Sequence, residues 1–224
     1  MEIGITTMYQ TRNVSKTLNE KLLFQNVNLS LDKGDICCLY GDNGAGKSVF
    51  IDCMLGFQPL DEGEILFEGR VIEGREPLKC NTGIVSVDHQ SFLENLTARE
   101  YFSLTMEVFE LDNEKNDALL FMLIDRFGLT EHLDSLFNEL SFGTKKKVQL
   151  IGNLIYSPLL LVCDEIFEGL DANGVEEVKK VFKERSQEGL ITFYTTHISQ
   201  ESQGVSNKNL YLRDKKILLN GDAK

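Results

Sequence analysis

A glycine-rich stretch, Gly41-Asp-Asn-Gly-Ala-Gly-Lys-Ser48, constrains this 224-residue chain more than any other feature. Its glycines permit backbone conformations that point successive N–H groups at phosphate oxygens, and a following helix presents its positive end to the same oxygens. We expect Lys47 to bridge the β- and γ-phosphates and Ser48 to ligate magnesium. The stretch therefore predicts a phosphate-binding loop (P-loop) for a nucleoside triphosphate with Mg²⁺. The predicted binding residues are Gly41, Asp42, Asn43, Gly44, Ala45, Gly46, Lys47, Ser48 and Val49.

The segments around the P-loop alternate between strand-like and helix-like patterns. Residues 36–40 are apolar on both faces, as in a central strand, and residues 48–55 have the apolar spacing of a helix. Further strands are predicted at 24–31, 64–69, 83–87, 159–163 and 190–195, and a further helix at 175–187. Alternating strands and helices with buried strands predict an α/β fold with a mainly parallel sheet.

One long segment differs in character from the rest. Residues 97–140 are rich in Leu, Phe, Glu, Lys and Asp, contain no proline and show helical apolar spacing. They predict a helical lobe inserted into the sheet domain. We therefore expect a single domain over residues 1–224, with a nucleotide-binding core at 1–90 and 155–224 and the lobe at about 91–154.

Two carboxylates follow the apolar strand predicted at 159–163. Asp164 and Glu165 would stand at the tip of the sheet beside the P-loop, where Asp164 can hold magnesium through water and Glu165 can polarise an attacking water. An acidic pair after a strand is often only a solvated loop. Its combination with a P-loop favours the catalytic role.

Composition limits the function classes and the location. The formal net charge of -12 and the pI near 4.8 argue against phosphate-backbone binding, so we expect no direct nucleic-acid partner. The five cysteines include no CxxC pair and are interpreted as reduced core thiols of a cytosolic protein. No segment has the length and apolarity of a membrane span, and the N-terminus lacks the pattern of a signal peptide.

Three further motifs complete a recognisable order. Leu140-Ser-Phe-Gly-Thr144 precedes the carboxylate strand, Gly169-Leu-Asp171 follows it, and His197 comes directly after the strand at 190–195. With the P-loop, this order resembles the ATP-binding subunit of an ATP-binding cassette (ABC) transporter, most like the bacterial export-type cassettes. The resemblance covers nearly the whole chain. It implies a P-loop NTPase (RecA-like) core with an N-terminal antiparallel β part, and an ATPase whose dimer closure powers transport, in the export direction.

The resemblance also assigns roles to single residues. Ser141 and Gly143 of the signature motif would contact the γ-phosphate of the ATP held by a second subunit, and His197 would contact the γ-phosphate and the attacking water. Glu165, His197 and Lys47 would then form the catalytic set. Taken alone, Ser141 could simply cap a helix, and His197 could be an ordinary residue at a strand end.

The chain departs from the family pattern at several positions. Phe142 and Thr144 replace the second glycine and the glutamine of the signature, and residues 166–167 are Ile-Phe where Pro-Thr is usual. The aromatic residue that stacks on adenine aligns with Leu18, and Tyr9 is the only aromatic residue nearby. Because leucine offers no stacking surface, we expect weaker binding of the base.

Two positions compete for the family's glutamine, which senses the metal and the transmembrane subunit. An ungapped alignment places it at Asp88, whereas Gln90 requires a local shift and is the preferred metal ligand beside Ser48 and Asp164. The alternative is that residues 88–91 only link a strand to a helix. The lysine run at 145–147 is interpreted as a solvated face without a special function.

The expected partners follow from the resemblance. They are a second ATPase subunit, identical or different, and transmembrane permease subunits that would hold the chain at the cytoplasmic face of the membrane. The cofactors would be ATP and Mg²⁺. Two other function classes stay open: a soluble ABC ATPase in nucleic-acid or ribosome-related work, and an unrelated P-loop NTPase such as a kinase or GTPase.

Overall fold

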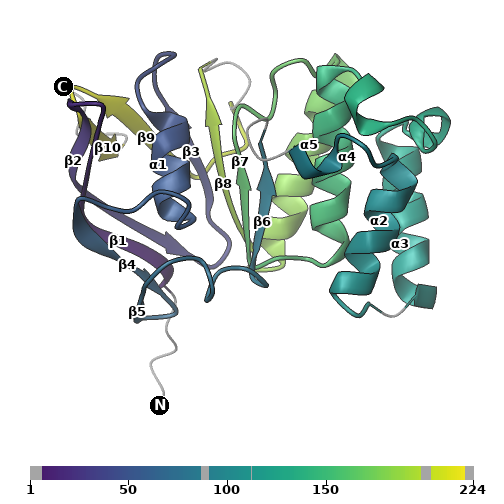
Figure 1. The fold of residues 1–224 in the computed structure, drawn as a ribbon, viewed down its shortest axis with the longest axis horizontal. Helices are drawn as coiled ribbons and strands as arrows, with labels where there is room; N and C mark the ends of the chain where they lie inside the picture. The colour runs from purple at the N-terminus through teal and green to yellow at the C-terminus, as the bar shows by residue number, and fades with distance from the viewer. Residues whose placement is uncertain (1–6, 87–90, 112, 198–202, 220–224) are drawn as a thin grey trace.

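The computed structural model describes residues 7–86, 91–111, 113–197 and 203–219, and their strands form two sheets (Figure 1). The first sheet has the strand order β2-β1-β4-β5, and every neighbouring pair is antiparallel. Its strands are β1 (Thr7–Leu18), β2 (Lys21–Asp32), β4 (Glu62–Phe67) and β5 (Arg70–Ile72). The predicted N-terminal antiparallel β part is confirmed.

The second sheet has the order β10-β9-β3-β8-β7-β6 and is parallel except for the pairing of β10 with β9. Its strands are β3 (Ile36–Tyr40), β6 (Thr82–Val85), β7 (Leu160–Cys163), β8 (Ile191–Thr196), β9 (Lys208–Arg213) and β10 (Lys216–Leu219). The mainly parallel sheet is therefore also confirmed. Strands β1, β5, β9 and β10 lie outside the predicted set, because their exposed positions interrupt the apolar pattern.

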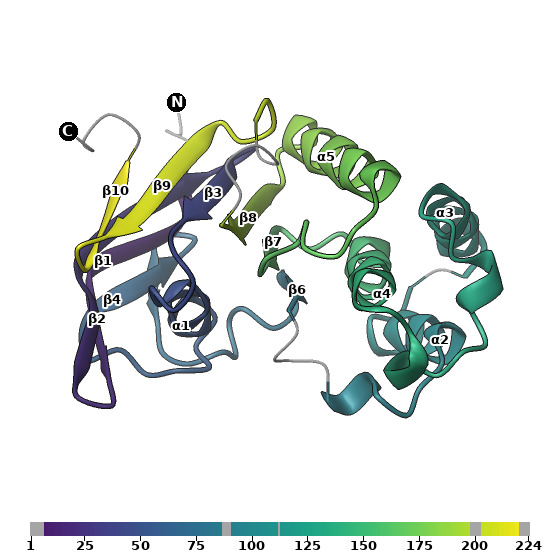
Figure 2. The same cartoon turned by 90° about the horizontal axis from the view of Figure 1, so that it is seen from above.

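The helices occupy both sides of the parallel sheet and one end of the molecule. The α-helices are α1 (Lys47–Met54), α2 (Ala98–Val108), α3 (Asn113–Arg126), α4 (Phe142–Ile155) and α5 (Ala172–Gln187). Three 3₁₀ turns are η1 (Ser91–Leu93), η2 (Thr130–His132) and η3 (Phe137–Glu139). Figure 2 shows α2 and α3 together at the end of the molecule opposite β1 and β2, as predicted for an inserted helical lobe. None of the helices in the described ranges has the length and hydropathy needed to cross a bilayer.

Side chains of the central strand β3 alternate between two hydrophobic clusters. Ile36 and Cys38 belong to the cluster that contains the apolar faces of α4 and α5. Cys37 and Leu39 belong to the cluster that contains residues of α1 and the antiparallel sheet. Burial on both faces explains why this strand is apolar throughout. The last residue of this strand, Tyr40, stands directly before the P-loop.

The edge strand β6 is held by side chains of α4. The Asn153 amide accepts a hydrogen bond from the Ile84 N–H at 3.0 Å and donates to the Ile84 carbonyl at 2.9 Å. The Gln149 amide does the same with Ser86, at 3.2 and 3.1 Å. Four residues of a helix and two residues of a strand span nearly the same length, about 6 Å, so the two amides match alternate strand residues. Helix α4 thus replaces a further strand at this edge.

The cysteines agree with the predicted core thiols except at one position. Cys37, Cys38, Cys53 and Cys163 are buried, and all five cysteines are free thiols. Cys80 is exposed, so its interpretation as a core residue is wrong. It lies in a turn before β6 rather than in a strand or helix.

Candidate functional site

The P-loop connects the carboxyl end of β3 to the first residue of α1. Gly44 and Gly46 have φ angles of 75° and 108°, which residues with a Cβ rarely adopt. Helix α1 begins at Lys47, so the N–H groups of its first turn face the loop. Asp42, Asn43 and Gly44 are exposed, and Gly41, Ala45, Gly46, Ser48 and Val49 are half-buried. The loop therefore offers a concave row of N–H donors suited to phosphate oxygens.

The Lys47 ammonium lies inside the curve of the loop. Its side chain is 6% exposed, and Nζ donates to the carbonyl oxygens of Gly41 at 2.8 Å and Asp42 at 3.4 Å. Nζ also lies 2.9 Å from Oε1 of Glu165. Lys47, predicted to bind phosphate, is thus in direct contact with Glu165, predicted to act on water.

Ser48 and Asp164 come together at the ends of neighbouring elements. The Ser48 hydroxyl donates to Asp164 Oδ2 at 2.6 Å, and the Thr195 hydroxyl donates to the other carboxylate oxygen. Thr195 was not among the predicted site residues, because a threonine within an apolar strand carries no signal of its own. Its fully buried hydroxyl also accepts from the Glu165 N–H at 2.9 Å, so it orients both carboxylate residues.

The Glu165 carboxylate sits between two nitrogen groups. Oε1 pairs with Lys47, and Oε2 accepts from Nδ1 of His197 at 2.9 Å. Partial burial by itself raises the pKa of this carboxyl, but hydrogen bonds from Lys47 and His197 outweigh that effect and leave the pKa below its usual range. Glu165 is therefore ionised at neutral pH and can accept a proton.

The main chain of Glu165 is in an uncommon conformation. Its φ angle of 48° lies in the left-handed region, which costs a residue with a Cβ about 1–2 kcal/mol. The N–H is held by Thr195, and the carbonyl oxygen accepts from the Lys146 ammonium. Contacts on both sides of the residue therefore offset the cost of this conformation.

The signature segment begins helix α4 and packs against the loop after β7. Ser141 caps the helix, because its Oγ accepts from the Thr144 N–H at 3.2 Å. A Cβ added to Gly143 would lie 2.2 Å from the Gly169 carbonyl oxygen, so only glycine fits here. Lys147 pairs with Asp171 at 2.8 Å, and this hydrogen bond lowers the pKa of the Asp171 carboxyl. The described hydrogen bonds of Ser141 stay within α4 and do not reach the P-loop.

One expectation near the site is corrected. Lys146 is fully buried, so the interpretation of the lysine run as a solvated face is wrong for this residue. The run gives no direct sign of which lysine points inward. Tyr9, the aromatic residue near the position aligned with the adenine-stacking residue, is fully buried and donates its hydroxyl to the Met54 carbonyl at 2.6 Å, so it offers no surface to a base. Asp88 and Gln90 lie outside the described residues.

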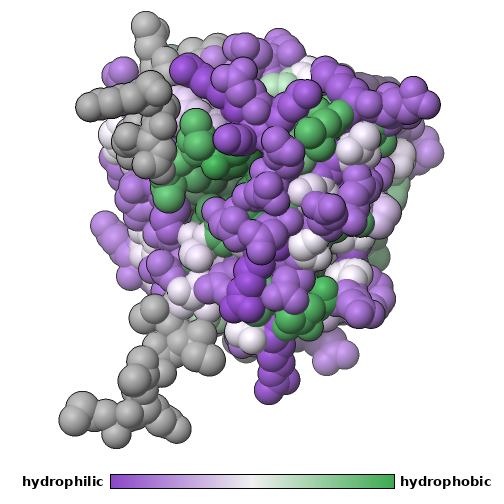
Figure 3. Space-filling model, turned by 90° about the vertical axis from the view of Figure 1, so that its left-hand side faces the viewer, coloured by the Kyte–Doolittle hydropathy of each residue, from purple (hydrophilic) through white to green (hydrophobic). Residues whose placement is uncertain are grey.

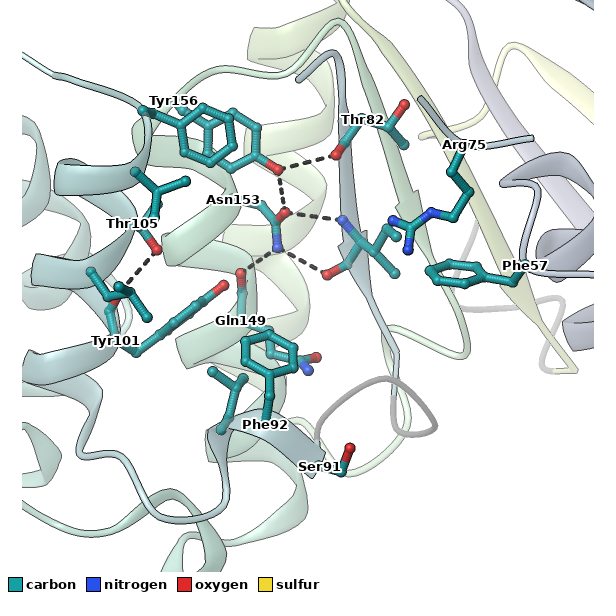
Figure 4. A pocket seen from close by; sticks show the side chains of 15 residues that line it. Phe57, Arg75, Thr82, Ser91, Phe92, Tyr101, Thr105, Gln149, Asn153 and Tyr156 are labelled. Atoms are coloured by element: carbon teal, nitrogen blue, oxygen red, sulfur yellow. Dashed lines mark hydrogen bonds between the residues drawn. The ribbon is translucent and has the colours of Figure 1, made fainter. Parts of the chain in front are cut away.

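A groove of about 460 Å³ lies between β6 and helices α2 and α4 (Figure 4). Phe92, Leu104 and Val108 line it and are 64%, 42% and 64% exposed. Its floor includes two amides of α4: Asn153 bonds to Ile84 of β6 (Figure 4), and Gln149 bonds to Ser86 just after that strand. Exposed large apolar side chains beside a satisfied polar floor are typical of a protein-docking surface.

Comparisons with known proteins show to which family the chain belongs. The family model of ABC transporters matches residues 24–168. The lantibiotic transport ATP-binding protein of Streptococcus pyogenes is 26% identical over 95% of this chain and 90% of its own length. The linearmycin resistance ATP-binding protein of Bacillus subtilis is 30% identical, over 87% of this chain and 62% of its own. The glutamate/aspartate import ATP-binding protein of Escherichia coli is 26% identical, over 94% and 89%.

A solved structure shares the fold. The ATP-binding subunit of an ABC transporter superposes with a TM-score of 0.85 over 96% of this chain and 90% of its own, at 23% identity. The family match covers more than half of the sequence and contains the P-loop, the signature segment and the Asp164–Glu165 pair. The chain therefore belongs to the ABC transporter family as an ATP-binding subunit, an ATPase of the kind that drives transport.

Proposed function

We propose that hydrolysis takes place at the convergence of Lys47, Glu165 and His197. The observation that carries the proposal is the ionised Glu165 carboxylate, held within 2.9 Å of both nitrogen groups. When ATP enters, the γ-phosphate competes for the Lys47 ammonium, and the Glu165 Oε1 released from it can accept a proton from the attacking water. His197 then orients the carboxylate and the γ-phosphate from the opposite side.

The residues beside this carboxylate suit Mg²⁺. Ser48 Oγ and Asp164 Oδ2 are oxygen donors 2.6 Å apart, and Mg²⁺ prefers oxygen ligands. Ser48 would bind the ion directly and Asp164 through water. When bound, Mg²⁺ neutralises charge that develops on the β- and γ-phosphate oxygens. Gln90, the third proposed ligand, is outside the described residues.

The signature segment is proposed to complete the site of a second subunit, identical or different. Ser141 is exposed and stands with Gly143 at the N-terminus of α4, a helix of 14 residues. An N-terminus of this kind attracts phosphate through its unpaired N–H groups and its dipole. ATP held by the partner would meet these N–H groups on closure of the dimer. Hydrolysis then depends on assembly.

The groove lined by Phe92, Leu104 and Val108 is proposed to receive a transmembrane permease subunit, which would hold the chain at the cytoplasmic face of the membrane. By contrast, hydrophobic residues on the face at the β1, β2 and β10 end lie in separate patches among hydrophilic ones (Figure 3).

We propose export as the direction, supported by the 30% identical linearmycin resistance relative, because resistance fits outward movement. Co-purification from native membranes and identification of the bound permease tests both points. An importer-type permease would contradict export, and recovery without any permease would contradict docking.

The reaction is tested by Glu165→Gln, which keeps the size of the side chain but removes its charge. We expect ATP to bind with near-normal affinity, hydrolysis to fall roughly 10²–10⁴-fold, and an ATP-dependent dimer to accumulate. Steady-state hydrolysis and size-exclusion chromatography with light scattering measure these effects. Glu188→Gln, an exposed glutamate after α5, is the matched control and should behave as wild type. Unchanged hydrolysis would refute the role of Glu165, and a monomer with bound ATP would refute the composite site.

A further inference from the structure

A buried lysine links the first turns of α4 to the loop that carries Glu165. Lys146 is 0% exposed, and its Nζ donates to the carbonyl oxygens of Glu165 and, at 3.0 Å, of Glu168. The Glu168 N–H also donates to the Glu165 carbonyl oxygen at 3.1 Å, so residues 165–168 form a turn closed around the ammonium. Burial lowers the pKa of Lys146 to about 8, while neighbouring carboxylates, Glu168 first, favour its charged form.

An aromatic ring covers the same ammonium. The ring centroid of Phe142 lies 4.2 Å from Lys146 Nζ, within the range of a cation–π contact. A Cβ added to Gly169 would come within 2.8 Å of this ring, so the ring also lies against the loop after Glu168. Phe142 is one of the departures from the signature pattern. Its ring shields the ammonium from water and strengthens the two hydrogen bonds to the carbonyls.

The position of the Glu165 carboxylate depends on its main chain. With a φ angle of 48°, the residue turns its side chain between Lys47 and His197, and its N–H donates to the Thr195 hydroxyl. On the carbonyl side the side-chain donor is Lys146. The usual proline after the acidic pair would restrict the loop, but residue 166 here is Ile. The Lys146 contact therefore restrains the loop in place of the proline that is absent at position 166.

We propose that Lys146 is a positioning residue for ATP hydrolysis: by holding the carbonyls of Glu165 and Glu168 under the Phe142 ring, its ammonium fixes the direction of the Glu165 carboxylate. The proposal rests on the catalytic role proposed for Glu165. It assigns the middle lysine of the 145–147 run to the reaction and leaves Lys145 without such a role. It also gives Phe142, at a signature position, a function within its own subunit.

The test compares Lys146→Met with Lys145→Met, a control that removes the same charge one residue away. A carboxylate misplaced by about 1 Å can lower the rate on the order of 10²-fold, so we expect kcat of Lys146→Met to fall by at least tenfold. The Kd for ATP should stay within about twofold, because Lys146 does not touch the P-loop among its described contacts. Lys145→Met should keep wild-type kcat.

Conservative variants separate positioning from loss of fold. Lys146→Arg keeps a cation with several donors, and Lys146→Gln keeps two N–H donors, so both should recover part of kcat at unchanged Kd. If Lys146→Met does not fold, these two variants carry the test, with the order wild type, Arg, Gln in kcat. Wild-type kcat in folded Lys146→Met, or in folded Lys146→Gln, would overturn the proposal.

The two proposals fail in different ways. Hydrolysis by Glu165→Gln at the wild-type rate would remove the catalytic role and, with it, the function assigned to Lys146. Loss of hydrolysis in Glu165→Gln together with full activity in Lys146→Met would overturn only the positioning role. Equal losses of kcat and ATP affinity in Lys146→Met would indicate general disruption of the site and would also count against it.

Discussion

The two ends of the parallel sheet each bury a cation against main-chain carbonyls. At the carboxyl end, Lys146 donates to the carbonyls of Glu165 and Glu168. At the amino end, Arg185 of α5 is 4% exposed and donates to the carbonyls of Pro158 at 2.8 Å and Ile191 at 3.2 Å. Burial is the main cause that lowers both pKa values, to about 8 for Lys146 and about 10 for Arg185.

The same interaction serves different purposes at the two ends. The carbonyls bound by Arg185 stand at the starts of β7 and β8, so this cation fixes where two central strands begin. The carbonyls bound by Lys146 belong to a turn whose first residue, Glu165, is a proposed catalytic group. A cation at the amino end should therefore matter for stability, whereas the cation at the carboxyl end should matter for the rate of hydrolysis.

The largest effect on stability is expected from Arg185→Met. This change leaves the Pro158 and Ile191 carbonyls without their buried donor, and unsatisfied buried groups cost about 1–3 kcal/mol. We expect the free energy of unfolding in urea to fall by about that amount and kcat per folded molecule to stay unchanged. In Lys146→Met, by contrast, the main loss should be in kcat per folded molecule. A fall in kcat per folded molecule of Arg185→Met would contradict the inference that Arg185 serves stability and not hydrolysis.

The pH dependence should distinguish the two cations. The pKa of Lys146 is about 8 in the folded chain against 10.5 in the unfolded chain, so in this window the unfolded state binds more protons. The contribution of this group to stability therefore rises with pH, by at most about 1.4 kcal/mol per unit, and is lost as the pH falls through 8. Hydrolysis should instead decline as pH rises through 8, because the ammonium loses its charge.

The contribution of Lys146 is separated from that of other titrating groups by subtracting the unfolding free energy of Lys146→Met from that of the wild type. The wild type minus Lys146→Met difference in unfolding free energy should rise between pH 8 and pH 9.5. Arg185 adds nothing to that slope, because it is present in both proteins and its titration cancels in the difference. Lys146→Arg should keep its kcat over the same range. The role of the Lys146 ammonium would be contradicted if the difference in unfolding free energy did not change with pH. It would also be contradicted if kcat of Lys146→Arg declined with pH as steeply as kcat of the wild type.

Much of the site was predictable because its signals are local in sequence. The P-loop glycines, the Asp164–Glu165 pair at a strand end and His197 after the next strand each follow from short patterns, and parallel pairing brings their strands together. The predicted roles of these residues stay proposals. Local patterns predicted β3, β6, β7 and β8 of the parallel sheet. They missed β9 and β10, which lie together at one side of the sheet and whose apolar alternation is broken by exposed positions.

What could not be predicted depends on how elements pack. Lys146 is four residues before the buried Leu150, so helical periodicity places both on the inner face of α4, but three consecutive lysines obscure that signal. The contact with the Glu165 carbonyl depends on the relative position of α4 and β7, which no short pattern encodes. The same holds for the Thr195 hydroxyl, because a threonine in a buried strand shows neither its partner nor its direction.

The smallest effect is expected from an ion pair at the amino end. Lys208 Nζ lies 2.6 Å from Asp35 Oδ2, with both side chains mostly buried, and mirrors the Lys47–Glu165 pair at the carboxyl end. Lys208→Met should lower the free energy of unfolding by about 0.5–1 kcal/mol, and less at high salt, without altering hydrolysis. Lys179→Met, which removes a more exposed pair on α5, is the control with a still smaller loss. If Lys208→Met slowed hydrolysis in folded protein, the amino end of the sheet would take part in the reaction. That result would contradict the inference that buried cations at the amino end serve stability and those at the carboxyl end serve hydrolysis.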